Sequence, residues 1–139
     1  MKKSYRGSCT CGAVQFEAAI DLAAGTTRCN CTFCRKARFW FAIVPVADFR
    51  ITRGADALVD YTRVPAGKAA SFLDFQFCRT CGIRAFTKGS DMPGLGAFYA
   101  VNLGCLDDAT DEELADTPIT YADGRHDDWA HPPAEHGYL

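Results

Sequence analysis

The spacing of the cysteines constrains this chain more than any other feature of its sequence. Seven of the eight cysteines fall into three tight clusters, and only Cys105 stands alone. Two thiolates from one short turn can supply half of a tetrahedral zinc site, so close pairs of this kind indicate metal binding. The clusters are Cys9-x-Cys11, Cys29-x-Cys31-x-x-Cys34 and Cys78-x-x-Cys81.

The residue after each cluster divides the cysteines into two groups. Gly12 and Gly82 directly follow the first and third clusters, whereas no glycine follows the middle one. Glycine tolerates positive φ, which lets backbone N–H groups point at thiolates and offset their charge. We therefore predict one closed structural zinc site, made of Cys9, Cys11, Cys78 and Cys81. Such sites contribute on the order of 10–16 kcal/mol in peptides, and a typical domain has a net stability of ~5–15 kcal/mol. We therefore expect the fold to depend on this metal.

The middle cluster leaves only three sulfurs, from Cys29, Cys31 and Cys34. Three protein ligands with an open fourth position are typical of catalytic zinc. Alternatively, a remote side chain closes the site, or two of its cysteines form a disulfide. The candidate fourth ligands are His126, His131, His136 and Cys105. The histidines are more typical of solvated or hydrogen-bonded surface residues, and Cys105 of a small core side chain.

Three basic residues, Arg35, Lys36 and Arg38, directly follow the middle cluster. Guanidinium and ammonium groups can bind the carboxylates of a small-molecule ligand. The alternative is a solvated basic face beside an anionic metal cluster. No His or Glu lies close in sequence to this cluster, so the sequence offers no candidate general base.

The chain of 139 residues is predicted to form one domain, with no repeat or long linker. Short apolar and alternating runs punctuated by Gly, Pro and Asp indicate a mainly β fold. Short helices are expected over 31–38 and, from the capping-box spacing of Thr110 and Glu113, over 110–114. Beyond Pro118 we expect an irregular tail. The predicted strands are 14–20, 39–46, 49–51, 58–64, 73–77, 83–87 and 97–103.

Charge is distributed unevenly between the body and the tail. Residues 1–106 carry a formal charge of +7, and residues 107–139 carry −9. The basic residues are scattered singly among apolar ones and form no block, so we expect no nucleic-acid partner. The acidic tail is predicted either to fold back over the basic body or to be solvated.

The compartment can be predicted from what the chain lacks. Two lysines near the N-terminus are not followed by an apolar run, and no stretch approaches ~18 apolar residues. We therefore expect no signal peptide and no membrane span, which places the protein in the reducing cytoplasm. Cysteines there more often bind metal or do chemistry than form disulfides.

Three segments that carry the cysteines resemble the signatures of one enzyme family. The segments are 7–16 (GSCTCGAVQF), 29–36 (CNCTFCRK) and 77–86 (FCRTCGIRAF). In order and interval they are similar to the glutathione-dependent formaldehyde-activating enzymes, whose domain is shared with centromere protein V. The resemblance runs from about Tyr5 to Leu106, and the tail from Asp107 matches poorly.

The resemblance implies a β-tent fold, in which small twisted antiparallel sheets are clamped by a four-cysteine zinc site. It implies that Cys9, Cys11, Cys78 and Cys81 hold the structural zinc and that Cys29, Cys31 and Cys34 hold a second, catalytic-type zinc. It also implies a carbon–sulfur lyase that condenses glutathione with formaldehyde to S-hydroxymethylglutathione. Arg35, Lys36 and Arg38 are then the candidates for binding the carboxylates of glutathione. Two alternatives are a non-catalytic zinc-stabilised binding module and a thiol redox or metal-buffering protein, since one fold hosts many functions.

Overall fold

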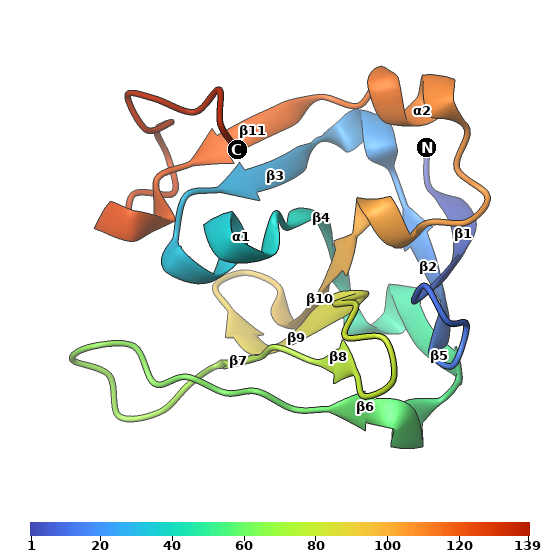
Figure 1. Ribbon diagram of the computed structural model, residues 1–139. Coiled ribbons are helices and arrows are strands. Elements are labelled where there is room, and N and C mark those ends of the chain that lie inside the picture. The colour runs from blue at the N-terminus through green and yellow to red at the C-terminus, as the bar shows by residue number, and fades with distance from the viewer.

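The computed structural model describes all 139 residues, which form eleven strands, two α-helices and five short 3-10 helices (Figure 1). The strands are arranged in three sheets of three, six and two strands. The mainly β fold predicted from the sequence is therefore confirmed. Neither α-helix has the length and apolar composition that a membrane-spanning helix requires.

The three-stranded sheet is antiparallel, in the order β1-β2-β5. Strand β2 buries Phe16, Ala18 and Ile20 on one face, as the alternating sequence pattern predicts. The connection between β1 and β2 carries Cys9 and Cys11, so these two cysteines lie in one turn. The strands are β1 (Lys3–Ser8), β2 (Gln15–Ile20) and β5 (Phe49–Arg53).

The six-stranded sheet has the order β11-β3-β4-β10-β9-β7. Its strand pairs are antiparallel except β11 and β3, which run parallel. Strands β6 (Leu58–Val59) and β8 (Phe77–Cys78) form the two-stranded sheet at the base of the view in Figure 1. The six strands are β3 (Thr26–Cys29), β4 (Trp40–Pro45), β7 (Leu73–Asp74), β9 (Phe86–Met92), β10 (Gly96–Asn102) and β11 (Ile119–Ala122).

Both predicted helices are present. Helix α1 (Thr32–Ala37) begins directly after Cys31 and ends at Arg38, which adopts a left-handed conformation with φ of 53°. Helix α2 (Asp111–Ala115) has the predicted capping box between Thr110 and Glu113. The 3-10 helices are η1 (Leu22–Ala24), η2 (Val46–Asp48), η3 (Ala55–Ala57), η4 (Leu103–Cys105) and η5 (Gly124–His126).

Strands β4 and β10 of the six-stranded sheet bury residues on both faces, which is consistent with the continuous apolar run over residues 39–46. Alternate residues of β4 and β10 point to opposite faces. One face contributes Val44 and Val101 to a core of 17 buried residues shared with the three-stranded sheet. The other contributes Phe41 and Phe98 to a smaller core of six buried residues, against which part of α1 packs.

Several predicted strands have different bounds in the structure. The strand predicted over 58–64 ends at Val59, and the one predicted over 73–77 is divided into β7 and β8, which belong to different sheets. The division occurs because the Phe75 N–H donates to the Tyr61 carbonyl rather than to a strand of the sheet. The strand predicted from residue 83 begins only at Phe86, since the Ile83 carbonyl accepts from the Cys78 N–H and so closes the loop that carries Cys81.

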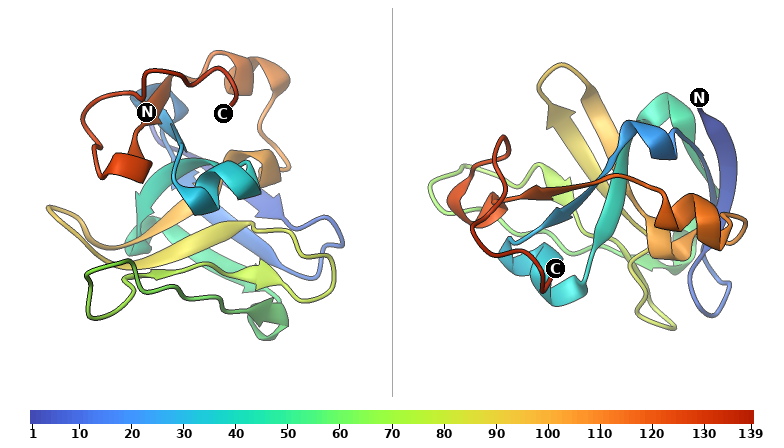
Figure 2. Two further views of the ribbon diagram at one scale, coloured as in Figure 1. Left: turned by 60° about the vertical axis from the view of Figure 1, so that its left-hand side comes forward. Right: turned by 90° about the horizontal axis from the view of Figure 1, so that it is seen from above.

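The tail contains more structure than predicted. The prediction of an irregular tail beyond Pro118 is wrong for β11, which pairs in parallel with β3 and so adds a strand to the large sheet. Tail carboxylates also pair with the basic body: Lys3 contacts Glu113 at 2.7 Å, and Arg6 contacts Asp108 at 3.1 Å. The tail therefore folds back over the body, and both views in Figure 2 place the C-terminal segment beside α1.

Candidate metal centres

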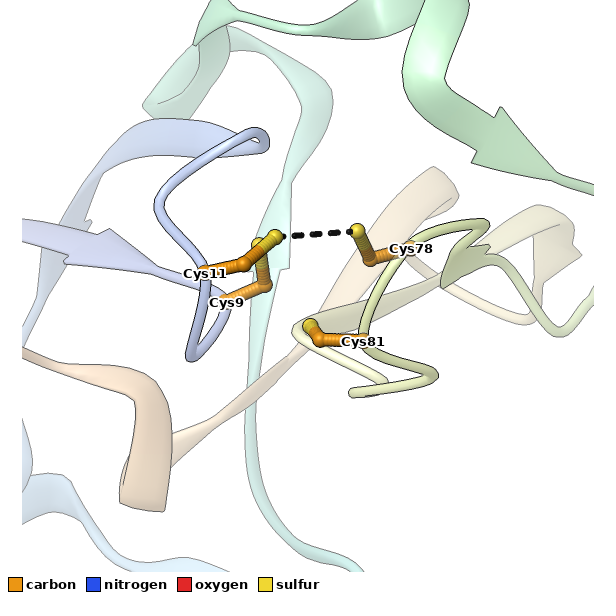
Figure 3. Close-up of side chains that lie close together, drawn as sticks. All are labelled: Cys9, Cys11, Cys78 and Cys81. Carbon is orange, nitrogen blue, oxygen red and sulfur yellow. Dashed lines mark hydrogen bonds between the residues drawn. The ribbon is translucent and has the colours of Figure 1, made fainter.

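Four cysteines from two distant turns converge at one point, which we call the four-cysteine site (Cys9, Cys11, Cys78 and Cys81). Their side chains point toward one another from the β1–β2 turn, from the end of β8 and from the turn that follows it (Figure 3). The Sγ atoms all lie within 4.8 Å of one another. Those of Cys9 and Cys11 are 3.6 Å apart, and those of Cys11 and Cys78 are 3.7 Å apart. Sulfurs bound at about 2.3 Å around one zinc would lie about 3.8 Å apart, so these four thiols fit a tetrahedral zinc ion.

The two turns have the glycine geometry that the sequence predicts. Gly12 has φ of 75° and Gly82 has φ of 76°, both in the left-handed region. Backbone N–H groups of Cys11 and Ile83 lower the pKa of Cys81 to about 6. The N–H of Val14 also donates to Cys9 Sγ at 3.3 Å. The backbone therefore stabilises thiolates, which are the form that binds zinc.

The three-cysteine site (Cys29, Cys31 and Cys34) is assembled from one continuous segment. Cys29 ends β3, Cys31 is the N-cap of α1, and Cys34 lies in α1. Their Sγ atoms also lie within 4.8 Å of one another. The N–H of Cys31 donates to Cys29 Sγ at 3.3 Å, and the N–H of Cys34 donates to Cys31 Sγ at 3.4 Å. Hydrogen bonds with Cys29 and Cys34 lower the pKa of Cys31 to about 2. Three converging soft ligands fit zinc with one position left for another ligand.

None of the candidate fourth ligands joins the three-cysteine site. His126 and His131 are exposed, and their Nδ1 atoms lie 2.8 Å from Asp123 and 3.0 Å from Asp128. The ring of His136 stacks on Tyr121 with centroids 4.1 Å apart. Cys105 is buried in the 17-residue core, and burial raises its pKa to about 12. All eight cysteines are free, so no disulfide closes either site.

A sequence model of the glutathione-dependent formaldehyde-activating enzymes matches residues 4–123 of this chain. The chain belongs to this family. The match extends past Leu106, where the motif resemblance stops, and so includes β11 and the first part of the acidic tail.

A solved structure supports the same assignment. A crystal structure of a Rhodobacter sphaeroides protein is similar to this chain with a TM-score of 0.65 and 31% sequence identity. The similarity covers 83% of this chain and 99% of that protein. The shared fold therefore extends over most of the domain.

In this member of the family, three arginines lie beside the three-cysteine site. Arg28, Arg35 and Arg38 line a recess beside two of its cysteines, which we call the arginine recess. Of the three residues predicted from the sequence, Arg35 and Arg38 line it and Lys36 does not. Arg28 was missed, although its place directly before Cys29 mirrors that of Arg35 directly after Cys34. The complete lining is Arg28, Cys29, Cys34, Arg35, Arg38, Phe39 and Leu139.

Two of these arginines are held in place by neighbouring groups. The Arg28 guanidinium lies 5.0 Å from the Trp40 ring centroid, a cation–π distance. Arg38 Nη1 donates to the Tyr138 carbonyl at 2.6 Å, so this guanidinium already binds a peptide carbonyl oxygen beside the cysteines. The recess therefore presents positive charge and hydrogen-bond donors next to thiols.

Proposed function

We propose that this protein is a carbon–sulfur lyase that condenses glutathione with formaldehyde to S-hydroxymethylglutathione. The observation that carries the proposal is the three-cysteine site, with its open position, beside the arginine recess. In the reaction a C–S bond forms between the glutathione sulfur and the carbonyl carbon, and the thiol proton ends on the former carbonyl oxygen. Atoms and electrons balance with no further reactant.

Cys29, Cys31 and Cys34 would hold the catalytic-type zinc, and Cys9, Cys11, Cys78 and Cys81 the structural one. Zinc, when bound at the three-cysteine site, supplies a positive charge that lowers the pKa of a substrate thiol. Three thiolates around one zinc leave a net charge of −1, so nearby positive charge is needed to accept a further thiolate. A reducing compartment such as the cytoplasm would keep the thiols free for metal.

The role of the chain's own residues is to bind and orient glutathione. Glutathione is a tripeptide thiol with a carboxylate near each end. Guanidinium groups bind carboxylates with paired hydrogen bonds, so Arg28, Arg35 and Arg38 are suited to bind the glutathione carboxylates. Lys36, on the exposed face of α1, adds positive charge nearby. Arg38 already donates to a peptide carbonyl of the chain's own C-terminal segment, at Tyr138, so glutathione would bind beside that contact or in place of it.

The test compares the rate of adduct formation with the unaided rate, because the condensation also proceeds without protein. We expect the zinc-loaded protein to exceed the blank and Cys31→Ser to fall to the blank. Arg53→Ala is a matched control, since Arg53 is an exposed residue at the end of β5, outside the recess. A wild-type rate no greater than the blank would reject the lyase and favour a zinc-stabilised binding module.

A further inference from the structure

The residue between the first two cysteines of the three-cysteine site makes unusually complete contacts with the tail. Asn30 is only 3% exposed, although it is polar. Its backbone N–H donates to the Ala122 carbonyl at 3.2 Å, and its Nδ2 donates to Asp123 Oδ1 at 2.7 Å. Its Oδ1 accepts from the Arg125 N–H at 2.9 Å. Both ends of the buried amide are therefore bound by residues 122–125.

The tail reaches the cysteines because β11 runs parallel to β3. The register places Ala122 opposite Cys29, so the residues after β11 continue alongside the Cys29–Cys31 turn. Gly124 then lies against the sulfur itself. A Cβ on Gly124 would lie 2.5 Å from Cys29 Sγ and 2.9 Å from the Trp129 ring. Only glycine leaves room for this sulfur.

Asp123 is itself held by a second set of contacts. Its Oδ2 lies 2.8 Å from His126 Nδ1. Its backbone N–H donates to the Asp128 carbonyl at 3.0 Å, and the Asp128 N–H donates back to the Asp123 carbonyl at 3.0 Å. Asp123, whose carboxylate accepts the hydrogen bond from Asn30, is therefore held through both its side chain and its backbone. It can in turn hold the Cys29–Cys31 turn in place.

We propose that Asn30 and Asp123 are positioning residues for the metal held by the three-cysteine site, and that Gly124 shapes the space for Cys29. The physical argument is that Cys29 ends a strand and Cys31 begins a helix, so the turn between them sets the angle between two ligands. Partners that orient metal ligands typically change metal affinity by about 10–100-fold when removed. The inference rests on metal binding at this site and not on lyase activity.

The experiment measures zinc affinity at each site by competition with a chromophoric chelator, using the full chain loaded with two zinc ions. Asn30→Asp places a carboxylate against Asp123 and should weaken the three-cysteine site by about 10–100-fold. Adding Asp123→Asn exchanges the hydrogen-bond donor and acceptor, because an amide at position 123 can donate to a carboxylate at position 30. The double variant should therefore recover most of the lost affinity, while the four-cysteine site is unchanged throughout.

Three further variants separate positioning from general destabilisation. Asn102→Asp also alters a half-buried amide, which donates to the Arg84 carbonyl, but lies outside both cysteine sites and should leave both zinc affinities unchanged. Gly124→Ala should weaken the three-cysteine site, whereas Gly137→Ala, with nothing within 4 Å of the new Cβ, should not.

The outcomes distinguish this inference from the proposed function. Unchanged affinity in Asn30→Asp, a parallel loss at both sites, no recovery in the double variant, or one zinc ion per wild-type chain would each overturn it. A wild-type protein that binds two zinc ions but does not accelerate adduct formation would reject the lyase and leave the positioning role intact.

Discussion

The two cysteine sites differ in how the chain assembles them. The four-cysteine site joins turns that lie 67 residues apart, as measured from Cys11 to Cys78. The three-cysteine site uses six consecutive residues, from Cys29 to Cys34. The first places Cys9 and Cys78 in the core of 17 buried residues, whereas the second places Cys29 in the core of six. A distant pairing stabilises the whole fold, and a local one can be changed while the fold remains.

The physical reason is the state of each site before the metal binds. In the unfolded chain the two halves of the four-cysteine site are far apart, so the metal can bind all four cysteines only when the chain folds and closes the loop between them. The free energy of metal binding therefore contributes directly to the free energy of folding. The three-cysteine site needs only a strand end, a turn and the first turn of α1. Its metal would therefore affect function more than stability.

The largest expected difference between the two sites comes from substituting one cysteine in each. Cys78→Ser should abolish cooperative unfolding. Structural zinc contributes on the order of 10–16 kcal/mol, which is as large as the net free energy of unfolding of a typical domain. Cys31→Ser should keep a cooperative transition close to that of the wild type. Circular dichroism during a thermal scan measures both.

Cys105→Ala is the control for losing a buried thiol outside both sites. It should cost about 1 kcal/mol, the size expected for a small core truncation. If Cys78→Ser unfolds no earlier than Cys31→Ser, the assignment of one structural and one functional site is wrong.

Metal removal should separate the two sites in the wild-type protein. With rising chelator concentration we expect one zinc to leave while far-UV circular dichroism is unchanged, because the three-cysteine site has fewer protein ligands. The second zinc should leave together with the secondary structure. Metal release and circular dichroism recorded on the same sample would show this, and simultaneous loss of both ions would contradict it.

The arginine recess should matter for activity alone. Arg28→Ala and Arg38→Ala should each raise KM for glutathione by about tenfold, equivalent to about 1.4 kcal/mol, through loss of a charged hydrogen bond. Neither change should alter the zinc content of the four-cysteine site. Steady-state kinetics with Arg53→Ala as the control measures this, and equal KM values in all variants would remove the recess from substrate binding.

An aromatic stack tests whether the two sites are independent. The ring centroids of Phe33, in α1, and Phe75 are 3.9 Å apart. The Arg84 guanidinium lies 5.0 Å from the Phe33 ring centroid and 4.9 Å from that of Phe77. Phe77 directly precedes Cys78, so these contacts connect the two sites. Phe33→Ala should lower the free energy of unfolding by about 2 kcal/mol, less than the roughly 3–5 kcal/mol of a fully buried Phe. Urea unfolding measures the loss.

Phe33→Leu is the matched variant, since it keeps apolar volume without the stack. It should lose less stability than Phe33→Ala and leave zinc affinity at the four-cysteine site unchanged. A loss of affinity there would show that the stack couples the two sites.

The cysteine groups could be predicted from the sequence because their geometry is local. Spacing and the following glycines bring two thiols into one turn, and the structure does place Gly12 and Gly82 at positive φ. The capping box of α2 and the alternation in β2 are local in the same sense. Each depends on residues only a few positions apart.

Long-range partners could not be predicted in this way. The parallel pairing of β11 with β3, and with it the contact between Asn30 and Asp123, joins residues 93 positions apart. Nothing in the local pattern around Asn30 distinguishes it from a loop residue. Arg28 was missed for a related reason, because it lines the recess only through the packing of α1 beside β3.

The smallest expected effect concerns the ion pair between Lys3 and Glu113, which attaches the tail to β1. The Glu113 carboxylate accepts hydrogen bonds from Lys3 at 2.7 Å and from the Tyr5 hydroxyl at 3.1 Å. The pKa of Glu113 is lowered to about 2, and the hydrogen bond from Lys3 is the main cause. A depressed carboxyl pKa stabilises the fold above the unfolded value of about 4.3. That contribution is lost as pH falls from there toward 2.

Glu113→Gln should therefore lower the wild-type Tm slightly at pH 7 and make Tm less sensitive to acid between pH 5 and about 3, which thermal scans at several pH values measure. The effect is small because the pair is on the surface. Zinc affinity at the three-cysteine site should be unchanged in this variant, since Asp123 rather than Glu113 contacts Asn30. A weakened three-cysteine site would instead mean that the whole tail, and not the short segment after β11, positions those cysteines.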